Sequence, residues 1–241
     1  MNKIRRCLTV ALGMSLLGCT QNTQDLSDTF ALAFSGSPTN EFSSQQVSNI
    51  PYASLFIKQG DAPTALTILA WVEKSDNAGP PTMKWLSKQN QLVVTQAGRI
   101  TKTVNLIGEN LTNLQSDKED PLAIGLNKAS TPKDWSYTLS WSPNYYINYP
   151  AFSHFEVGNI EPKKLVNGTR NLLHVVEHVS VPLLKSEMTN QYWLDPSTGK
   201  VVTSIQTPAP SMPTFTLTVA KPYVAKPNVA KPDKEPKGGE Q

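Results

Sequence analysis

Residues 135–141 read Trp-Ser-Tyr-Thr-Leu-Ser-Trp, so large apolar side chains alternate with small polar ones. Successive side chains of a β-strand point to opposite faces of a sheet, and this alternation therefore predicts a strand with one buried face. We expect Trp135, Tyr137 and Trp141 to lie on the buried side of that strand.

Runs of similar character occur along most of the chain. They are short, rich in aliphatic, aromatic and threonine residues, and separated by Gly, Pro, Asn or Asp, as is typical of an antiparallel sheet. The other predicted strands are residues 52–58, 65–73, 83–87, 92–95, 99–106, 152–157, 172–181, 191–194, 201–206 and 214–219. The sequence thus predicts a mainly β fold, an antiparallel sandwich or partly open barrel with one or two short helices.

Turns and short helices are indicated at three places. Gln96-Ala97-Gly98 stands between two predicted strands and favours a tight hairpin with its glycine at a positive φ. Residues 26–34 are expected to form one short helix. The polar segment 108–118, in which Leu111 and Leu114 are three positions apart, is compatible with a helix of one or two turns.

The beginning of the chain has the layout of a bacterial export signal. Three basic residues among the first six precede an apolar run, 8–17, that is too short to span a bilayer and is typical of a secretory signal peptide. The ending Leu16-Leu17-Gly18-Cys19 resembles the lipobox of bacterial lipoproteins, in which a diacylglycerol is attached to the cysteine thiol before cleavage. We predict a signal peptide over residues 1–18, a lipidated tether over 19–25, and lipid attachment at Cys19 with acyl chains such as palmitate.

Cysteine usage and charge narrow the class of protein further. The two cysteines are Cys7, inside the predicted signal peptide, and Cys19, so no disulfide is expected within the folded body. The 241 residues carry 22 basic and 19 acidic side chains, and removing the signal peptide leaves equal numbers of each. A neutral chain argues against nucleic-acid binding. Thr20, where inner-membrane lipoproteins carry an aspartate, indicates transfer to the outer membrane.

The C-terminal residues 219–241 contain the repeat Val-Ala-Lys-Pro three times. Proline at every fifth position blocks both helix formation and sheet pairing, so an extended segment is expected. We predict a single β domain over residues 26–218 followed by a Lys/Pro-rich flexible tail. A tethering or partner-binding role of the tail stands beside plain disorder as an alternative.

Motifs that carry catalysis give little support for an enzyme. The segment 174–178, His-Val-Val-Glu-His, matches a zinc-peptidase pattern that needs a helix to bring both histidines onto one metal. Its β-branched neighbours instead predict a strand, in which His174 and His178 would lie about 13 Å apart. Candidate glycosidase acids are Glu119-Asp120, or Glu156 with Glu161, and no nucleophile elbow or phosphate-binding glycine loop is present. We expect no catalytic residue, no cofactor and no metal site.

Aromatic residues gather between positions 135 and 149. Tyr145, Tyr146 and Tyr149 adjoin prolines and asparagines and lack a clean period, so we expect at least one of them to be exposed. An aromatic face beside amide side chains suits contact with a glycan or a protein partner, and these three tyrosines are the candidate residues. Packing into the core, or lining an apolar cavity for a lipid inside a barrel, are the alternatives.

Several fragments of the chain agree, in order, with one known family. They are Pro51-Tyr52-Ala53-Ser54-Leu55, Gly60-Asp61-Ala62-Pro63, Trp71-Val72-Glu73, Trp85, Gly98-Arg99-Ile100-Thr101-Lys102-Thr103 and Asn190-Gln191-Tyr192-Trp193-Leu194-Asp195. Through them the chain resembles the YjbF/GfcB (YmcC) lipoproteins over roughly residues 45–206, apart from the stretch 117–148. The resemblance implies an outer-membrane-associated lipoprotein that is encoded with exopolysaccharide or group 4 capsule export proteins and has no known enzymatic activity.

The expected function follows from this resemblance and the N-terminal motif. It is a non-enzymatic accessory lipoprotein in exopolysaccharide or group 4 capsule production and export, anchored by lipid in the outer membrane and facing the periplasm. Its expected partners are the membrane, polysaccharide export proteins and the polysaccharide itself, with no nucleic acid. The alternative is a periplasmic carrier that binds a lipid or a lipoprotein.

Overall fold

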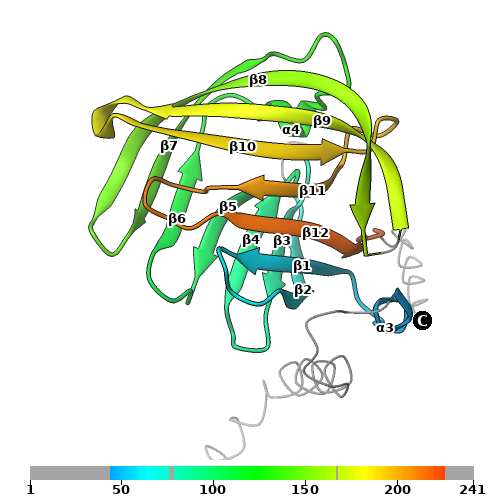
Figure 1. Ribbon diagram of the computed structural model, residues 1–241. Helices are drawn as coiled ribbons and strands as arrows, with labels where there is room; N and C mark the ends of the chain where they lie inside the picture. The colour runs from blue at the N-terminus through cyan, green and yellow to red at the C-terminus, as the bar shows by residue number, and fades with distance from the viewer. Residues whose placement is uncertain (1–43, 76–78, 167, 226–241) are drawn as a thin grey trace, which may run out of the picture.

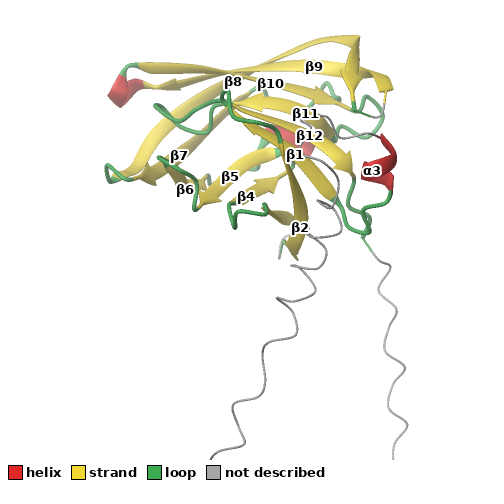
Figure 2. Ribbon diagram, turned by 60° about the horizontal axis from the view of Figure 1, so that its bottom comes forward, coloured by secondary structure: helices red, strands yellow, loops and turns green. Residues whose placement is uncertain are grey.

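The computed structural model describes residues 44–75, 79–166 and 168–225. Over these residues the chain forms one twelve-stranded antiparallel sheet that curves back on itself into a nearly closed barrel (Figures 1 and 2). The strands are β1 Ser54–Gln59, β2 Ala65–Glu73, β3 Thr82–Leu86, β4 Leu92–Gln96, β5 Arg99–Val104, β6 Asn110–Gln115, β7 Asp134–Ser142, β8 Tyr146–Leu165, β9 Gly168–Val181, β10 Ser186–Leu194, β11 Val201–Gln206 and β12 Phe215–Lys221. The mainly β prediction, with a partly open barrel as one of its two forms, is confirmed.

Strands that follow one another along the chain pair in the sheet, except β5 and β6, and the first strand β1 pairs with the last strand β12. The two sheet edges are therefore β5 and β6, which follow one another along the chain. Side chains bridge these edges: the backbone N–H of Leu111 donates to Oγ1 of Thr103 at 2.9 Å, and that hydroxyl donates to Oδ1 of Asn110 at 3.3 Å. These hydrogen bonds satisfy polar groups that an open sheet edge would leave unpaired.

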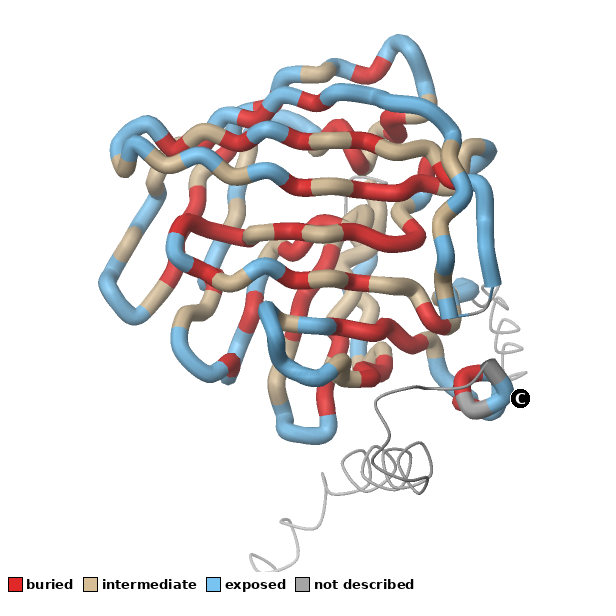
Figure 3. The backbone as a smooth tube through the Cα atoms, viewed as in Figure 1, coloured by how far each residue is buried: buried red, intermediate tan, exposed pale blue. Residues whose placement is uncertain are grey.

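The inside of the barrel holds the main core. On β7, Trp135, Tyr137, Leu139 and Trp141 all point inward and are buried, as their alternation predicts. Buried positions alternate with exposed or partly buried ones along much of β8, β9 and β10, the strands at the top of Figure 3. Core residues of the first strand β1 and the last strand β12 belong to the same cluster as those of β7, so the barrel is one packing unit.

The turn between β4 and β5 is the predicted two-residue hairpin. Ala97 and Gly98 have φ values of 49° and 88°, and Gln96 pairs with Arg99 across the turn. Positive φ at both central residues is the conformation that fits the right-handed twist of the flanking strands. A Cβ atom on Gly98 would also lie 2.5 Å from Cβ of Val201, so only glycine fits here.

The helix predicted within residues 108–118 is wrong, because Asn110–Gln115 forms strand β6. Its pairing with β7 shifts register between Leu111 and Asn113, so Thr112 is an extra residue in the ladder. Such a bulge lets two residues three positions apart face the same side of a sheet. Leu111 and Leu114 both contact the core for this reason. Their spacing of three positions therefore comes from a bulge in a strand and not from a helix.

Two boundaries differ from the prediction. Strand β8 is much longer than the predicted 152–157, since its far half extends with β9 as a hairpin whose exposed residues lack an apolar period. The predicted domain end at residue 218 is also too early: Val219 pairs with Leu55 and Lys221 with Ser54 before Pro222 ends the strand. The first Val-Ala-Lys of the repeat thus belongs to the sheet rather than to the tail.

Within the described residues, two short α-helices and the 3-10 helix η1, Pro182–Leu184, accompany the sheet. Helix α3, Ser44–Ser48, packs Val47 on the outer face against Phe56 and Ala220 (Figure 2). Helix α4, Pro121–Ile124, begins after Asp120, whose side chain accepts a hydrogen bond from the backbone N–H of Leu122. The predicted helix at 26–34, the signal peptide, the tether and the tail after residue 225 lie outside the described residues.

Candidate functional site

A buried ion-pair network crosses the inside of the barrel. Arg99, at the start of edge strand β5, is 3% exposed, and Glu177 on β9 is fully buried. The guanidinium Nη1 and Nη2 lie 3.0 and 2.9 Å from the two carboxylate oxygens of Glu177, and Nε lies 2.5 Å from Oδ2 of Asp120. The cation also lies 4.7 Å from the ring centroid of Trp135. The network therefore ties the sheet edge to the opposite wall.

Neutral side chains complete the coordination of Glu177. Ser153, Asn190 and Tyr192 each donate a hydrogen bond to its carboxylate at 2.8 to 2.9 Å. Burial alone would raise the pKa of Glu177, but the charge of Arg99 and these hydrogen bonds outweigh burial, so that the pKa is lowered. Glu177 is thus held as a carboxylate inside the barrel.

The lowered pKa of Glu177 predicts acid sensitivity. In the unfolded chain this carboxyl takes up a proton near its ordinary value of 4.5, whereas in the folded protein it does so at a lower pH. Its contribution to stability is therefore fully present above about pH 4.5 and is lost as the pH falls through the folded pKa. Denaturant titrations across this range should give a smaller dependence of unfolding free energy on pH for Glu177→Gln than for the wild type. Equal slopes would contradict the assignment.

The barrel interior is filled by its own side chains. Trp141, Phe155, Tyr192 and Phe215 are among the largest side chains that are less than 2% exposed, and they belong to one continuous cluster. A carrier of the kind considered above would need an apolar cavity in this space. The packing gives that alternative no support.

The two histidines of the zinc-peptidase pattern lie on strand β9, as predicted, and on its outer face. His174 stacks on Trp193 with 4.7 Å between ring centroids, while His178 lies 3.5 Å from Glu156. Glu177 between them points inward, so the sheet separates the motif's carboxylate from its histidines. In the part of the chain that the structure describes, no group of three or more His, Cys, Asp or Glu side chains is arranged to hold a metal ion.

This strand geometry predicts that the purified protein holds no stoichiometric zinc. Metal analysis by mass spectrometry should find much less than one zinc per chain, and a chelator should leave the melting temperature unchanged. The variant His178→Ala should melt like the wild type, because this side chain is half exposed. One tightly bound zinc per chain would contradict the placement of both histidines.

The predicted glycan-contact tyrosines occupy different environments at the β7–β8 turn. Tyr145 is 88% exposed, as expected for at least one of the three. Tyr146 is partly buried and stacks on Trp141 with ring centroids 4.4 Å apart, and Tyr149 meets the same ring edge-on at 5.4 Å. Two of the candidates therefore pack against the core, and Tyr145 alone presents most of its ring to solvent.

Three of the four candidate glycosidase acids make contacts of their own, and the fourth, Glu119, is exposed. Asp120 holds Arg99, and Glu161 accepts a hydrogen bond from Nε1 of Trp193 at 2.7 Å. Glu156 lies beside His178 on the exposed face. These contacts favour structural roles for Asp120 and Glu161.

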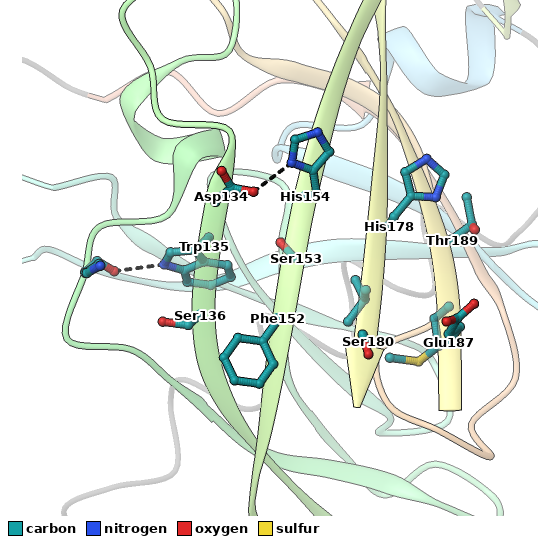
Figure 4. Close-up of a pocket in the computed structure, with 13 residues that line it drawn as sticks. Asp134, Trp135, Ser136, Phe152, Ser153, His154, His178, Ser180, Glu187 and Thr189 are labelled. Carbon is teal, nitrogen blue, oxygen red and sulfur yellow. Dashed lines mark hydrogen bonds and ion pairs between the residues drawn. The ribbon is translucent and has the colours of Figure 1, made fainter. Parts of the chain in front are cut away.

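The outer face of the sheet carries a concave surface that the sequence did not reveal. A cavity of about 580 Å³ lies over β7, β8, β9 and β10, and a second of about 520 Å³ adjoins it over β6, β7 and β8. Lys118, Ser136 and Phe152 line both, so the two form one trough. We refer to this surface as the outer trough, and Figure 4 shows the half of it that lies over β7 to β10.

Two rows of side chains cross the outer trough from strand to strand. In the first row Ser136 pairs with Phe152, Phe152 with Ser180, and Ser180 with Glu187. The second row, two residues along each strand, consists of Asp134, His154, His178 and Thr189. Phe152 is 53% exposed and is the large apolar side chain among these polar ones (Figure 4).

An N-terminal lipobox-like motif ahead of a barrel-like domain is the organisation of a bacterial lipoprotein. Comparison with protein families identifies which one: the model described as "Group 4 capsule polysaccharide lipoprotein gfcB, YjbF" matches residues 27–219. The chain therefore belongs to this family, which confirms the resemblance seen in its sequence fragments.

Two curated relatives come from Escherichia coli K12. The uncharacterized lipoprotein GfcB is 27% identical over 208 residues, covering 84% of this chain and 92% of GfcB. The uncharacterized lipoprotein YjbF is 26% identical over 204 residues, covering 84% of this chain and 91% of YjbF. The crystal structure of the hypothetical lipoprotein YmcC from the same species has a TM-score of 0.71 at 22% identity, covering 86% of this chain and 98% of YmcC, and so shares the fold.

None of the helices in the described residues is long and apolar enough to cross a membrane. Cys19, the predicted lipid attachment site, lies outside these residues.

Proposed function

We propose that this protein is a non-enzymatic accessory lipoprotein in the export of exopolysaccharide or group 4 capsule. It is anchored by lipid at Cys19 in the outer membrane and faces the periplasm, where polysaccharide export proteins and the polysaccharide are its partners. The observation that carries the proposal is that residues 27–219 match a family model whose description is a group 4 capsule polysaccharide lipoprotein. The engagement of Asp120 and Glu161 in structural contacts supports a role without catalysis.

Deletion of the gene tests the proposed role. Cells without the protein should carry less polysaccharide on their surface, and a plasmid copy of the wild-type gene should restore it. Surface polysaccharide can be quantified by sugar analysis of material sheared from washed cells. An unchanged amount in the deletion strain would overturn the proposal.

Lipid attachment at Cys19 predicts the outcome of one substitution. The variant Cys19→Ser lacks the thiol that takes the diacylglycerol, so it should not incorporate labelled palmitate and should leave the membrane fraction. Since the barrel lies far along the chain from residue 19, circular dichroism of the released protein should match that of the wild type. Membrane association without acylation would contradict the anchor.

A further inference from the structure

We infer that the outer trough is a binding site for an uncharged glycan chain, the face through which this protein contacts the polysaccharide. The inference rests on the proposed function, since it names the ligand class and the surface by which that role is carried out. Its basis is the shape, lining and charge of the trough.

The shape of the outer trough suits a polymer. It crosses five neighbouring strands, from β6 to β10, which lie about 4.8 Å apart and so span about 19 Å. The two halves join at Ser136 and Phe152, and both are open to solvent rather than enclosed. A linear chain can therefore lie along the trough and leave at either end.

The lining of the trough is amphipathic in the way that a sugar ring is. A pyranose has an apolar face of C–H groups and a rim of hydroxyls, so a site for it needs an exposed aromatic ring next to hydrogen-bonding side chains. Phe152 supplies the ring at the junction of the two halves. Among the described residues, the hydroxyls of Ser136, Ser180 and Thr189 line the trough and make no hydrogen bond to another protein group, so they are free to bond a ligand.

The charge of the trough selects among glycans. Asp117, Asp134 and Glu187 line it against one ammonium group, that of Lys118, and its other ionisable lining groups at the surface are His154 and His178. The carboxylate of Asp134 lies 2.7 Å from Nδ1 of His154. An excess of carboxylates repels a polyanion and accepts hydrogen bonds from neutral hydroxyls. The expected ligand is thus an uncharged polysaccharide.

Calorimetric titration of the full-length, lipid-modified protein in detergent tests the inference. The probes are oligosaccharides from the surface polysaccharide of the producing bacterium, separated by anion exchange into neutral and acidic fractions. The neutral fraction should bind. Phe152→Ala should weaken this binding at least tenfold, or about 1.4 kcal/mol, whereas Phe152→Tyr should keep it because the ring remains.

Two further variants control for folding and position. Ile160→Ala removes an equally exposed apolar side chain from the same strand outside the trough and should bind like the wild type. Ser136→Arg fills the junction of the two halves and should abolish binding while leaving the melting temperature within a few degrees of the wild type. The Ser136→Arg variant keeps the test valid if Phe152→Ala folds poorly.

Each outcome decides the inference. Unchanged affinity of Phe152→Ala and Ser136→Arg, binding of the acidic fraction alone, or no binding of either fraction would overturn it. Loss of surface polysaccharide on gene deletion without any binding would leave the proposed function standing and reject the trough. Glycan binding at the trough, together with unaffected surface polysaccharide in the deletion strain, would leave the trough standing and reject the proposed function.

Discussion

Replacing Arg99 by methionine is expected to destabilise the protein by about 3–5 kcal/mol. Methionine keeps an unbranched apolar stem at this position but leaves Glu177, which has no solvent exposure, without its cation. Asp120 loses its partner in the same step. Chemical denaturation followed by tryptophan fluorescence should show the transition shifted to much lower denaturant concentration.

Two control variants separate the buried network from the general effect of losing a charge. Lys84→Met removes the cation of the Lys84–Glu73 pair, whose side chains are 29% and 59% exposed, and should cost no more than about 1 kcal/mol. The double variant Arg99→Met with Glu177→Gln should be more stable than Arg99→Met alone, since the buried charge is removed together with its partner. A transition of Arg99→Met that coincides with the wild type would show that the network does not stabilise the barrel.

Truncation of Trp141 to alanine should cost about 3–5 kcal/mol. The side chain is 1% exposed, and its removal leaves a cavity that Tyr146 and Tyr149 cannot fill without losing their own contacts. Thermal melts should show a marked drop in melting temperature. Trp141→Phe should cost much less, because the indole N–H has no hydrogen-bond partner among the described residues and its loss leaves no polar group unpaired.

Tyr145→Ala is the matched control for the same turn. Its ring is 88% exposed, so the free energy of unfolding should change by less than about 0.5 kcal/mol. Tyr146→Ala should fall between the two, since its ring is only partly buried and contributes one face of the stack. A Trp141→Ala protein that melts like the wild type would place this residue outside the core.

The sequence predicted most strands because each is an apolar run bounded by turn residues. Strands β2 and β11 have the predicted bounds. Prediction failed where geometry broke the period: the bulge at Thr112 gave β6 the spacing of a helix, and the protruding half of β8 has no buried face to give an apolar pattern. The pairing of β1 with β12, which joins the two ends of the domain, cannot be read from local pattern at all.

Site residues were harder to predict because they depend on contacts between distant strands. Glu177 occupies an inward position of β9, between the buried Val175 and Val179, and a carboxylate at such a position indicates a buried partner. That partner, Arg99, lies 78 positions away, and only the fold identifies it. Phe152 was missed for a similar reason: its outward direction follows from the burial of Ala151 and Ser153 beside it, whereas an aromatic residue in a strand is usually expected inside.

The central claim, a role in export rather than in synthesis, is tested most directly by the distribution of polysaccharide in cells that lack the protein. Total polysaccharide and its surface share should be measured in the deletion strain and in the strain complemented with the wild-type gene. The proposed role predicts a reduced surface share with the missing polymer retained inside the cell envelope, and its restoration on complementation. An unchanged surface share, or a fall in total polymer with the share preserved, would contradict it.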